Sequence, residues 1–271
     1  MDMRQILELD MRNLGDRIKA VRVAVQLGHL VSHFKTLVEP SIMPLHQKIP
    51  RIDSAGYVEL CANFVAKQYQ SAAVRDGVVK ILNAVAKAEI PNTIRIYEHP
   101  EKTKPPSTGL YLAPLGQQRS PRNHAEMANV IVVILHVLIR LHQIDFCHCD
   151  LRWPNVVFVD DEPFLIDFEY ARPIGSRGPD GLKTVDPRMQ KGVWDAAADS
   201  YQVLSMIEES FFSNEAERKL INEISLAKRI GPADLLAKLV DLKGDWLSAH
   251  TAYQKKIDEP DRKKAHEDKT E

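Results

Sequence analysis

The sequence has little that would commit the protein to disulfides or to nucleic acid. Its 271 residues include three cysteines, an odd number that cannot all pair within the chain, so we expect a reducing compartment. Its 36 Lys and Arg residues are matched by 37 Asp and Glu residues, and without an excess of positive charge we expect no general binding to nucleic acid. We therefore expect an intracellular protein, either cytoplasmic or nuclear.

The chain also lacks a long apolar run. Its most apolar stretch, VIVVILHVL at residues 130–138, is nine residues long and contains a histidine. A membrane-spanning helix needs about 20 apolar residues, so this stretch predicts a buried helix and we expect no membrane partner. The first residues, MDMRQILELD, place acids where a secretory signal has Lys or Arg, so we expect no signal peptide.

Hydrophobic periodicity divides the chain into four parts. Residues 1–50 are predicted to form an N-terminal helical extension that ends in several prolines. Residues 51–116 contain short strand-like runs around one predicted helix, and residues 117–250 are mostly helical in pattern, so the fold class is α+β. Residues 251–271 carry dense mixed charge and few apolar side chains, which predicts a disordered tail.

One loop concentrates the residues that can carry chemistry. The segment HCDLRWPN at residues 148–155 follows the long predicted helix, and IDFE begins at Ile166 after two short strand-like runs. Together they place Asp150, Asn155 and Asp167 at loop and strand ends. Three such oxygen-bearing side chains suit a hard cation such as Mg²⁺, which binds few carboxylates and prefers to keep waters or phosphates.

These two motifs resemble those of the protein-kinase superfamily. HCDLRWPN is similar to the catalytic loop H-R-D-L-x-x-x-x-N, and Asp167-Phe168-Glu169, which begins 12 residues after Asn155, is similar to the metal-binding D-F-G. The wording DLRWPNVV…FLIDFEYA also resembles divergent kinase-like domains of fungi and oomycetes, including Crinkler-type effectors. Four further segments resemble the lysine strand, the fourth strand, the fifth strand with the hinge, and the central helix of the large lobe: residues 64–67, 90–98, 110–116 and 197–203.

The resemblance implies a two-lobed kinase-like fold, with a reduced β-rich small lobe and a mostly helical large lobe, that binds ATP and Mg²⁺. Asp150 would accept or orient the proton of the acceptor hydroxyl, and Arg152 would meet the transferred phosphoryl group. Lys67 would pair with the α- and β-phosphates of the nucleotide. Asn155 and Asp167 would hold the metal ion against those phosphates.

Other residues near the motifs have expected structural roles. The resemblance implies that Asp199 is a buried anchor for the catalytic loop. We expect His148 to pack under Phe168 and Trp153 to pack beneath the site. The sequence Cys147-His148-Cys149 does not predict a zinc site, because adjacent side chains on an extended chain point to opposite sides.

Several positions depart from the kinase pattern. No G-x-G-x-x-G precedes Lys67, so the loop that covers the phosphates is absent or rebuilt. The predicted helix over residues 71–88 offers no glutamate at the usual spacing to pair with Lys67. Cys149 replaces the catalytic-loop arginine, and Glu169 replaces the glycine of D-F-G. The sequence has no A-P-E, and Val185-Asp186-Pro187-Arg188 occupies that neighbourhood.

Three functions remain open from the sequence. We favour a divergent protein Ser/Thr kinase that transfers the γ-phosphoryl group of ATP to a protein hydroxyl. A small-molecule phosphotransferase related to choline and aminoglycoside kinases is the second, and the Glu169-Tyr170-Ala171 sequence favours it. A pseudokinase that binds or scaffolds without catalysis is the third, because the glycine loop and the helix glutamate are missing. The sequence indicates neither the acceptor nor the oligomeric state.

Overall fold

The structure is a computed structural model of the chain. Residues 48–271 belong to one compact unit. The residues that the structure describes are 47–50, 57–61, 64–98, 105, 107–178, 184–189, 192–210, 213–227 and 229–267. The helices predicted within residues 1–38 lie outside this set, and the boundaries of the four predicted parts stay predictions.

The first described elements form a five-stranded sheet. Its strands are β1 (Gln47–Pro50), β2 (Tyr57–Leu60), β3 (Val65–Gln68), β4 (Arg95–Ile96) and β5 (Gly109–Ala113). Their order in the sheet is β1-β2-β3-β5-β4, so β3 is central and pairs antiparallel with both β2 and β5. Lys67 therefore lies on the central strand, opposite Val58 on one side and Leu110 on the other.

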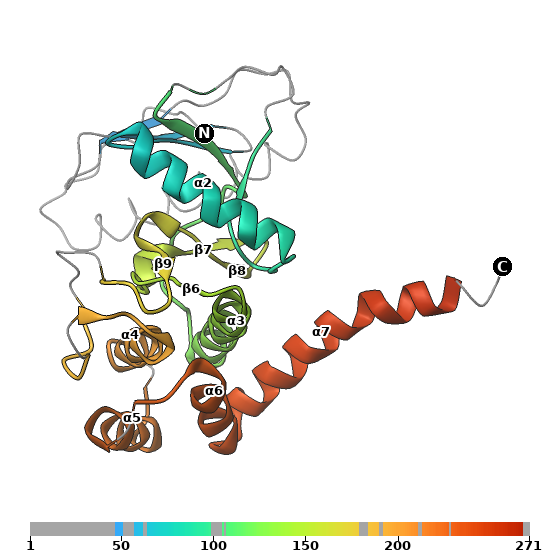
Figure 1. The fold of residues 1–271 in the computed structure, drawn as a ribbon. Coiled ribbons are helices and arrows are strands. Elements are labelled where there is room, and N and C mark those ends of the chain that lie inside the picture. The colour runs from blue at the N-terminus through green and yellow to red at the C-terminus, as the bar shows by residue number, and fades with distance from the viewer. Residues whose placement is uncertain are drawn as a thin grey trace, which may run out of the picture. The chain divides into compact units, whose positions relative to one another are not determined.

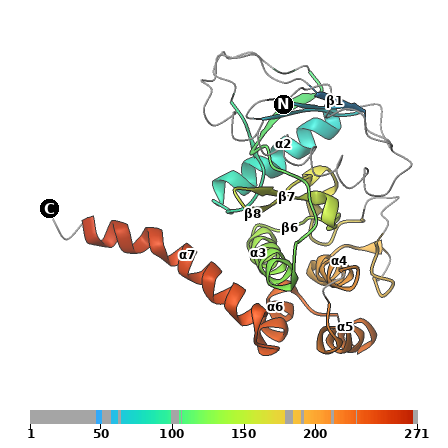
Figure 2. The ribbon, with the colours of Figure 1, turned by 180° about the vertical axis from the view of Figure 1, so that it is seen from behind.

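Helix α2 (Ala72–Lys87) lies against this sheet (Figures 1 and 2). It begins after Ser71, whose hydroxyl oxygen accepts a hydrogen bond from the Val74 N–H, an N-cap that satisfies one of the free donors of the first turn. One helical face is apolar, and its residues Val78, Ile81, Leu82 and Val85 are buried. The sheet and α2 together make up the small lobe.

The large lobe is mostly helical. Its helices are α3 (His124–Gln143), α4 (Ala196–Glu208), α5 (Glu215–Ala227), α6 (Pro232–Asp241) and α7 (Asp245–Glu267). Helix α3 carries the apolar run of the sequence and packs against α4, α6 and α7 (Figure 1). By length and composition alone α3 could cross a membrane, but 61% of its most apolar window is buried inside the protein. It is the core helix of this lobe.

Short elements between α3 and α4 connect the two lobes. They are β6 (Phe146–Cys147), the 3-10 helix η2 (Trp153–Asn155), β7 (Val156–Val159), β8 (Glu162–Leu165), the 3-10 helix η3 (Phe168–Tyr170) and β9 (Arg172–Pro173). β7 and β8 form an antiparallel hairpin, and β6 pairs with β9. The hairpin is joined to the small lobe because the Leu165 N–H donates to Asn92 O at 2.8 Å and Leu165 O accepts from the Ile94 N–H at 3.1 Å.

Two terminal predictions need correction. Residues 251–271 were expected to be a disordered tail, but α7 continues to Glu267. Tyr253 is buried and Ile257, four residues later, packs against the core, so one face of this charged stretch is anchored by apolar contacts. Lys256 also pairs with Glu162 on β8. At the other end, residues 47–50 of the predicted helical extension form strand β1.

Candidate active site

A cavity of about 350 Å³ lies between the sheet, α2 and the β7–β8 hairpin. Its walls are mainly aliphatic side chains, and Lys67 and Asp167 supply charged groups to the lining. A largely apolar cavity with a few placed polar groups is the usual form of a small-molecule site. The aliphatic lining includes Val58, Val65, Leu112, Val78, Leu82 and Val157.

The linker between the lobes passes very close to one wall of this cavity. A Cβ atom on Gly116 would lie 2.7 Å from Val157 Cγ2 and 3.0 Å from Phe158 O, so only glycine fits there without displacement. The next residue, Gln117, exchanges two backbone hydrogen bonds with Phe158, of 2.8 and 2.9 Å. These contacts fix the linker against β7 at the edge of the cavity.

The structure brings Asp150, Arg152 and Asn155 together, as their spacing predicts. Asn155 Nδ2 donates to both Asp150 Oδ2 and Asp150 O at 2.7 Å, and Arg152 Nε donates to Asp150 Oδ2 at 3.1 Å. The Ile166 N–H donates to Asn155 O at 2.9 Å, which holds the residue before Asp167 against this loop. The two motifs of the sequence therefore meet at one place.

Asp199 anchors the loop from below. It is fully buried, and its carboxylate accepts hydrogen bonds from the backbone N–H groups of His148 and Cys149 at 2.9 and 3.0 Å, and from Trp194 Nε1 at 3.0 Å. His142 Nε2 lies 2.8 Å from the same carboxylate. Burial alone would raise the pKa of Asp199, but His142 and the backbone donors outweigh it, and the pKa lies below its usual value. The anchor is therefore a charged carboxylate.

Gln202 is a second anchor, which the sequence did not identify. Its Oε1 accepts from the Leu151 N–H at 2.8 Å, and its Nε2 donates to Cys149 O at 2.9 Å and Thr184 O at 2.8 Å. Gln202 and Asp199 are three residues apart on α4 and share a helical face, a spacing that could have indicated this role. Through Gln202, the loop is also tied to the segment around Thr184.

His148 and Trp153 are held as the sequence predicts for structural residues. His148 Nε2 donates to Ile166 O at 3.1 Å, and its ring meets the edge of Phe168 with centroids 4.9 Å apart. Burial lowers the pKa of His148, which favours the neutral imidazole. Trp153 Nε1 donates to Met206 O at 3.0 Å, and its ring packs against the core.

Lys67 reaches across the cavity to the second motif. Its Nζ lies 2.6 Å from Asp167 Oδ1 and 3.1 Å from Glu169 Oε2. The sequence predicted no helix acid for Lys67, and the structure supplies two carboxylates from another segment instead. Asp167 adopts φ = +65° and begins the turn η3, which carries Glu169. The left-handed conformation costs energy in a non-glycine residue and is common at functional sites.

The position expected for A-P-E contains a buried ion-pair cluster. Asp186 is almost fully buried and accepts from Arg188 Nε at 2.9 Å and from Arg229 Nε at 3.0 Å. Arg229 also pairs with Asp195 at the start of α4. Burial opposes ionisation of Asp186, but Arg188 and Arg229 together lower its pKa. Asp186 thus ties the described residues 184–189 to the helical core, and Arg229 had no signal in the local sequence.

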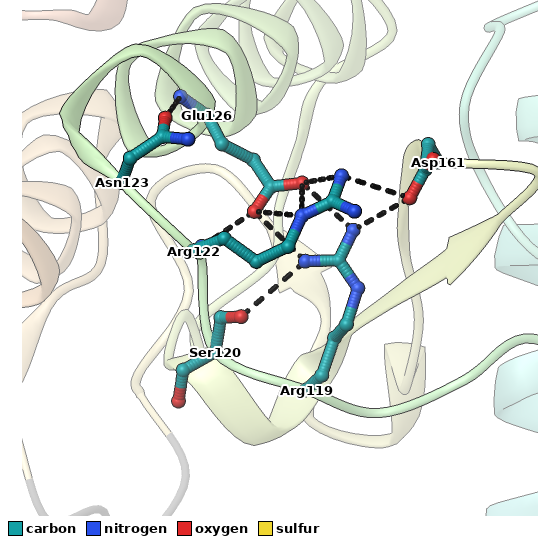
Figure 3. Close-up of polar contacts among 6 residues, drawn as sticks. All are labelled: Arg119, Ser120, Arg122, Asn123, Glu126 and Asp161. Carbon is teal, nitrogen blue, oxygen red and sulfur yellow. Dashed lines mark hydrogen bonds and ion pairs between the residues drawn. The ribbon is translucent and has the colours of Figure 1, made fainter. Parts of the chain in front are cut away.

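A charged network fastens the linker to the hairpin, as Figure 3 shows. Glu126 accepts from Arg119 and Arg122, and both arginines also reach Asp161 at 3.0 Å in the β7–β8 turn. Burial of Glu126 works against its charge, yet the two arginines lower its pKa to about 2. The Arg119 guanidinium also lies 3.6 Å from the centroid of the Phe158 ring. These contacts are on the outside of the joint and serve its structure.

Three potential metal ligands lie together beside the loop, namely His142, Cys147 and Asp199. The Asp199 oxygens already accept the four hydrogen bonds described above. Burial raises the pKa of the Cys147 thiol far above its usual value, so the thiolate that a metal ion requires is disfavoured. Within this group, Asp199 and His142 form the anchor of the loop at residues 148–155.

Together these features define the architecture. The fold is α+β with two lobes, an arrangement consistent with the kinase-like fold that the sequence motifs imply. No family model matches the chain, and no curated protein matches it. Among solved structures, the chain is similar to "Structure of the Cydia pomonella Granulovirus kinase, PK-1", with 15% identity over 71% of this chain and 78% of that chain and a TM-score of 0.45. The resemblance to Crinkler-type domains is tested by none of these comparisons and stays a prediction.

Proposed function

We propose that this protein is an ATP- and Mg²⁺-dependent phosphotransferase, and in its finer form a divergent protein Ser/Thr kinase. The observation that carries the proposal is that Lys67 and Asp167, 100 residues apart, meet in one cavity while the Asp150 loop is held next to Ile166 in its lining. Lys67 from β3 contacts Asp167, and the backbone pairing of Asn155 with Ile166 holds the Asp150 loop beside them. Such a set can bind a nucleotide and orient an acceptor hydroxyl.

The cavity suits a nucleotide in both shape and chemistry. Its mainly aliphatic walls are suited to an apolar, planar group such as an adenine ring, and the linker residues Pro114 to Gly116 belong to its lining. Lys67 would meet the phosphates from the charged part of the lining. A single placed ammonium is consistent with a protein whose net charge is near zero, because the phosphate is bound locally rather than by a basic surface.

The residues proposed for Mg²⁺ fit that ion by their donor types. Asp167 offers a carboxylate and Asn155 an amide oxygen, both hard ligands of the kind Mg²⁺ prefers. The Asn155 amide nitrogen is engaged by Asp150, which assigns its carbonyl oxygen to the opposite side of the group. When bound, Mg²⁺ would neutralise phosphate charge that develops during transfer.

Within this proposal, the residues of the loop act by position and charge. Asp150 Oδ2 is held by Asn155 and Arg152, so the carboxylate is oriented to take or direct the proton of an acceptor hydroxyl. The Arg152 side chain is 41% exposed, which leaves guanidinium donors available to a transferring phosphoryl group. A protein acceptor is favoured because Gln202 binds both Cys149 O of the loop and Thr184 O, and Arg229 holds Asp186, so residues 184–189 keep a fixed position near the loop.

The test is phosphoryl transfer by the purified full chain with Mg²⁺ and labelled ATP. We expect phosphate on the chain itself or on a generic protein substrate, and we expect Asp150→Asn to lower the rate by about 100-fold or more while nucleotide binding is kept. Parallel reactions with choline and aminoglycosides test the small-molecule alternative. If nucleotide binds but wild type and Asp150→Asn are equally inactive with every acceptor, the protein is a pseudokinase. If Mg²⁺·ATP causes no thermal shift, the proposal is wrong.

A further inference from the structure

The ammonium group of Lys67 is buried and needs opposite charge nearby. Its side chain is 9% exposed, whereas those of Asp167 and Glu169 are 21% and 14% exposed. A buried charge is tolerated only where partners compensate for its lost hydration. Both compensating carboxylates come from one three-residue stretch, and they lie 2.6 and 3.1 Å from the ammonium nitrogen.

Helix α2 contributes no acid to this group. All of its residues are described, and the ones that line the cavity are the apolar Val78 and Leu82. The acid it contains, Asp76, pairs with Arg75 at 3.2 Å and has a side chain 64% exposed. The turn η3 packs against α2 in the fold. Glu169 therefore approaches Lys67 from the side on which α2 lies.

Binding of a metal ion would affect the ion pairs of the two carboxylates with Lys67 differently. Asp167 is the proposed Mg²⁺ ligand, and a divalent cation would compete with the Lys67 ammonium for its oxygens. Once the 2.6 Å contact is lost, the buried ammonium depends on the nucleotide phosphates and on any acid that stays beside it. Glu169 is placed to do so, because its carboxylate already lies within ion-pair distance.

We propose that Glu169 is a positioning residue: the resident counter-ion of Lys67, which holds the ammonium in place while Asp167 binds the metal. This inference rests on the proposed function. It gives a physical reason for a glutamate where the kinase pattern has glycine, since the same residue replaces the missing helix acid. It also places the lysine partner and the metal ligand on one turn, so both move together with η3.

The proposal predicts how metal affinity responds to each side chain. In Glu169→Gln, the Lys67 ammonium keeps Asp167 as its remaining carboxylate in this group and competes more strongly with the metal ion for it. We therefore expect Mn²⁺ affinity to fall about tenfold, the size of a typical coupling between close charges. In Lys67→Met the competing cation is gone, and affinity is expected to stay or rise. In the double variant Lys67→Met/Glu169→Gln, loss of Glu169 should cost nothing further, because its target is absent.

The experiment measures Mn²⁺ binding to the full chain by electron paramagnetic resonance with a non-hydrolysable ATP analogue. Because Lys67 is also proposed to meet the phosphates, the analogue concentration is set to saturate each variant, so that weaker nucleotide binding does not change the measured Mn²⁺ affinity. Asp76→Asn is the matched control, since it removes the α2 acid and should leave the affinity unchanged. If Glu169→Gln weakens Mn²⁺ equally with and without Lys67, Glu169 is itself a metal ligand and the proposal is overturned. If Glu169→Gln changes nothing, it is overturned as well.

A second measurement needs neither metal nor nucleotide. Urea unfolding of wild type, both single variants and the double variant gives the coupling between Lys67 and Glu169 in the free protein. We expect the changes in the free energy of unfolding to be non-additive, with Lys67→Met recovering part of the stability lost in Glu169→Gln. If Glu169→Gln alone fails to fold, the double variant should fold again. If the effects of the two substitutions on the free energy of unfolding are additive, Lys67 and Glu169 are not coupled and the proposal is rejected. If wild type binds no Mn²⁺–nucleotide complex, the proposed function fails. The urea measurement still tests the Lys67–Glu169 pair, because it needs neither ligand.

Discussion

The two lobes hold their parts of the site in different ways. In the large lobe, the loop at residues 148–155 is held by Asp199 and Gln202, two buried side chains on one helix that bind its backbone N–H and C=O groups. In the small lobe, Lys67 is one long side chain that reaches carboxylates of the other lobe. Backbone hydrogen bonds to a rigid helix fix a loop permanently, whereas an ion pair across a cavity can exchange partners when a charged ligand arrives.

The largest expected effect concerns the Asp199 anchor in the large lobe. Asp199→Asn keeps the shape of the side chain but removes the charge that faces the backbone N–H groups of His148 and Cys149. We expect a loss of about 3 kcal/mol or more in the free energy of unfolding, because the buried donors lose a charged acceptor. Urea denaturation measures it. An unchanged midpoint would mean that the loop is held by other contacts.

A smaller effect is expected at the joint between the lobes. In Gly116→Ala the new methyl group would press on Val157 and Phe158 O, and we expect a loss of about 1–3 kcal/mol from overpacking together with weaker nucleotide binding. Gly77→Ala is the matched control: nothing lies within 4 Å of its Cβ position on α2, so we expect about 1 kcal/mol of stabilisation. Calorimetric unfolding and nucleotide titration check both. Equal behaviour of the two variants would show that the close approach at Gly116 is unimportant.

The smallest expected effect concerns pH and lies wholly in the large lobe. His124 at the start of α3 contacts Glu217 on α5 and Asp245 on α7. Burial disfavours its charged form, but these two carboxylates raise its pKa above 6.5. A raised folded-state pKa adds stability that is complete below the unfolded-state pKa and is lost as pH rises through the folded-state pKa.

Wild type should therefore lose its advantage over His124→Gln as pH rises from below about 6.5 through the raised folded-state pKa. Thermal unfolding at a series of pH values measures the difference between the two proteins. A constant difference between wild type and His124→Gln would show that His124 does not change charge between the folded and unfolded states.

Local pattern was enough to predict much of the fold and the central loop. The apolar periodicity of α2 and α3 predicts their positions, and the motif spacing places Asp150 and Asn155 on one loop, where the structure adds that Asn155 Nδ2 donates to Asp150 Oδ2. The charged segment after residue 251 was misjudged because composition averages over all faces of a helix. Tyr253 and Ile257, four residues apart, pack against the core and anchor the part of α7 around them.

The sequence by itself determined the residue types at the site and the spacing within each motif, because neighbours on one loop or helix are placed by local geometry. Only the tertiary structure decided which acids reach Lys67, since Asp167 lies 100 residues away in the chain. The same holds for Arg229, which meets Asp186 from 43 residues away. Such partners are chosen by packing and by the need to compensate buried charge, and neither is visible in the order of the amino acids.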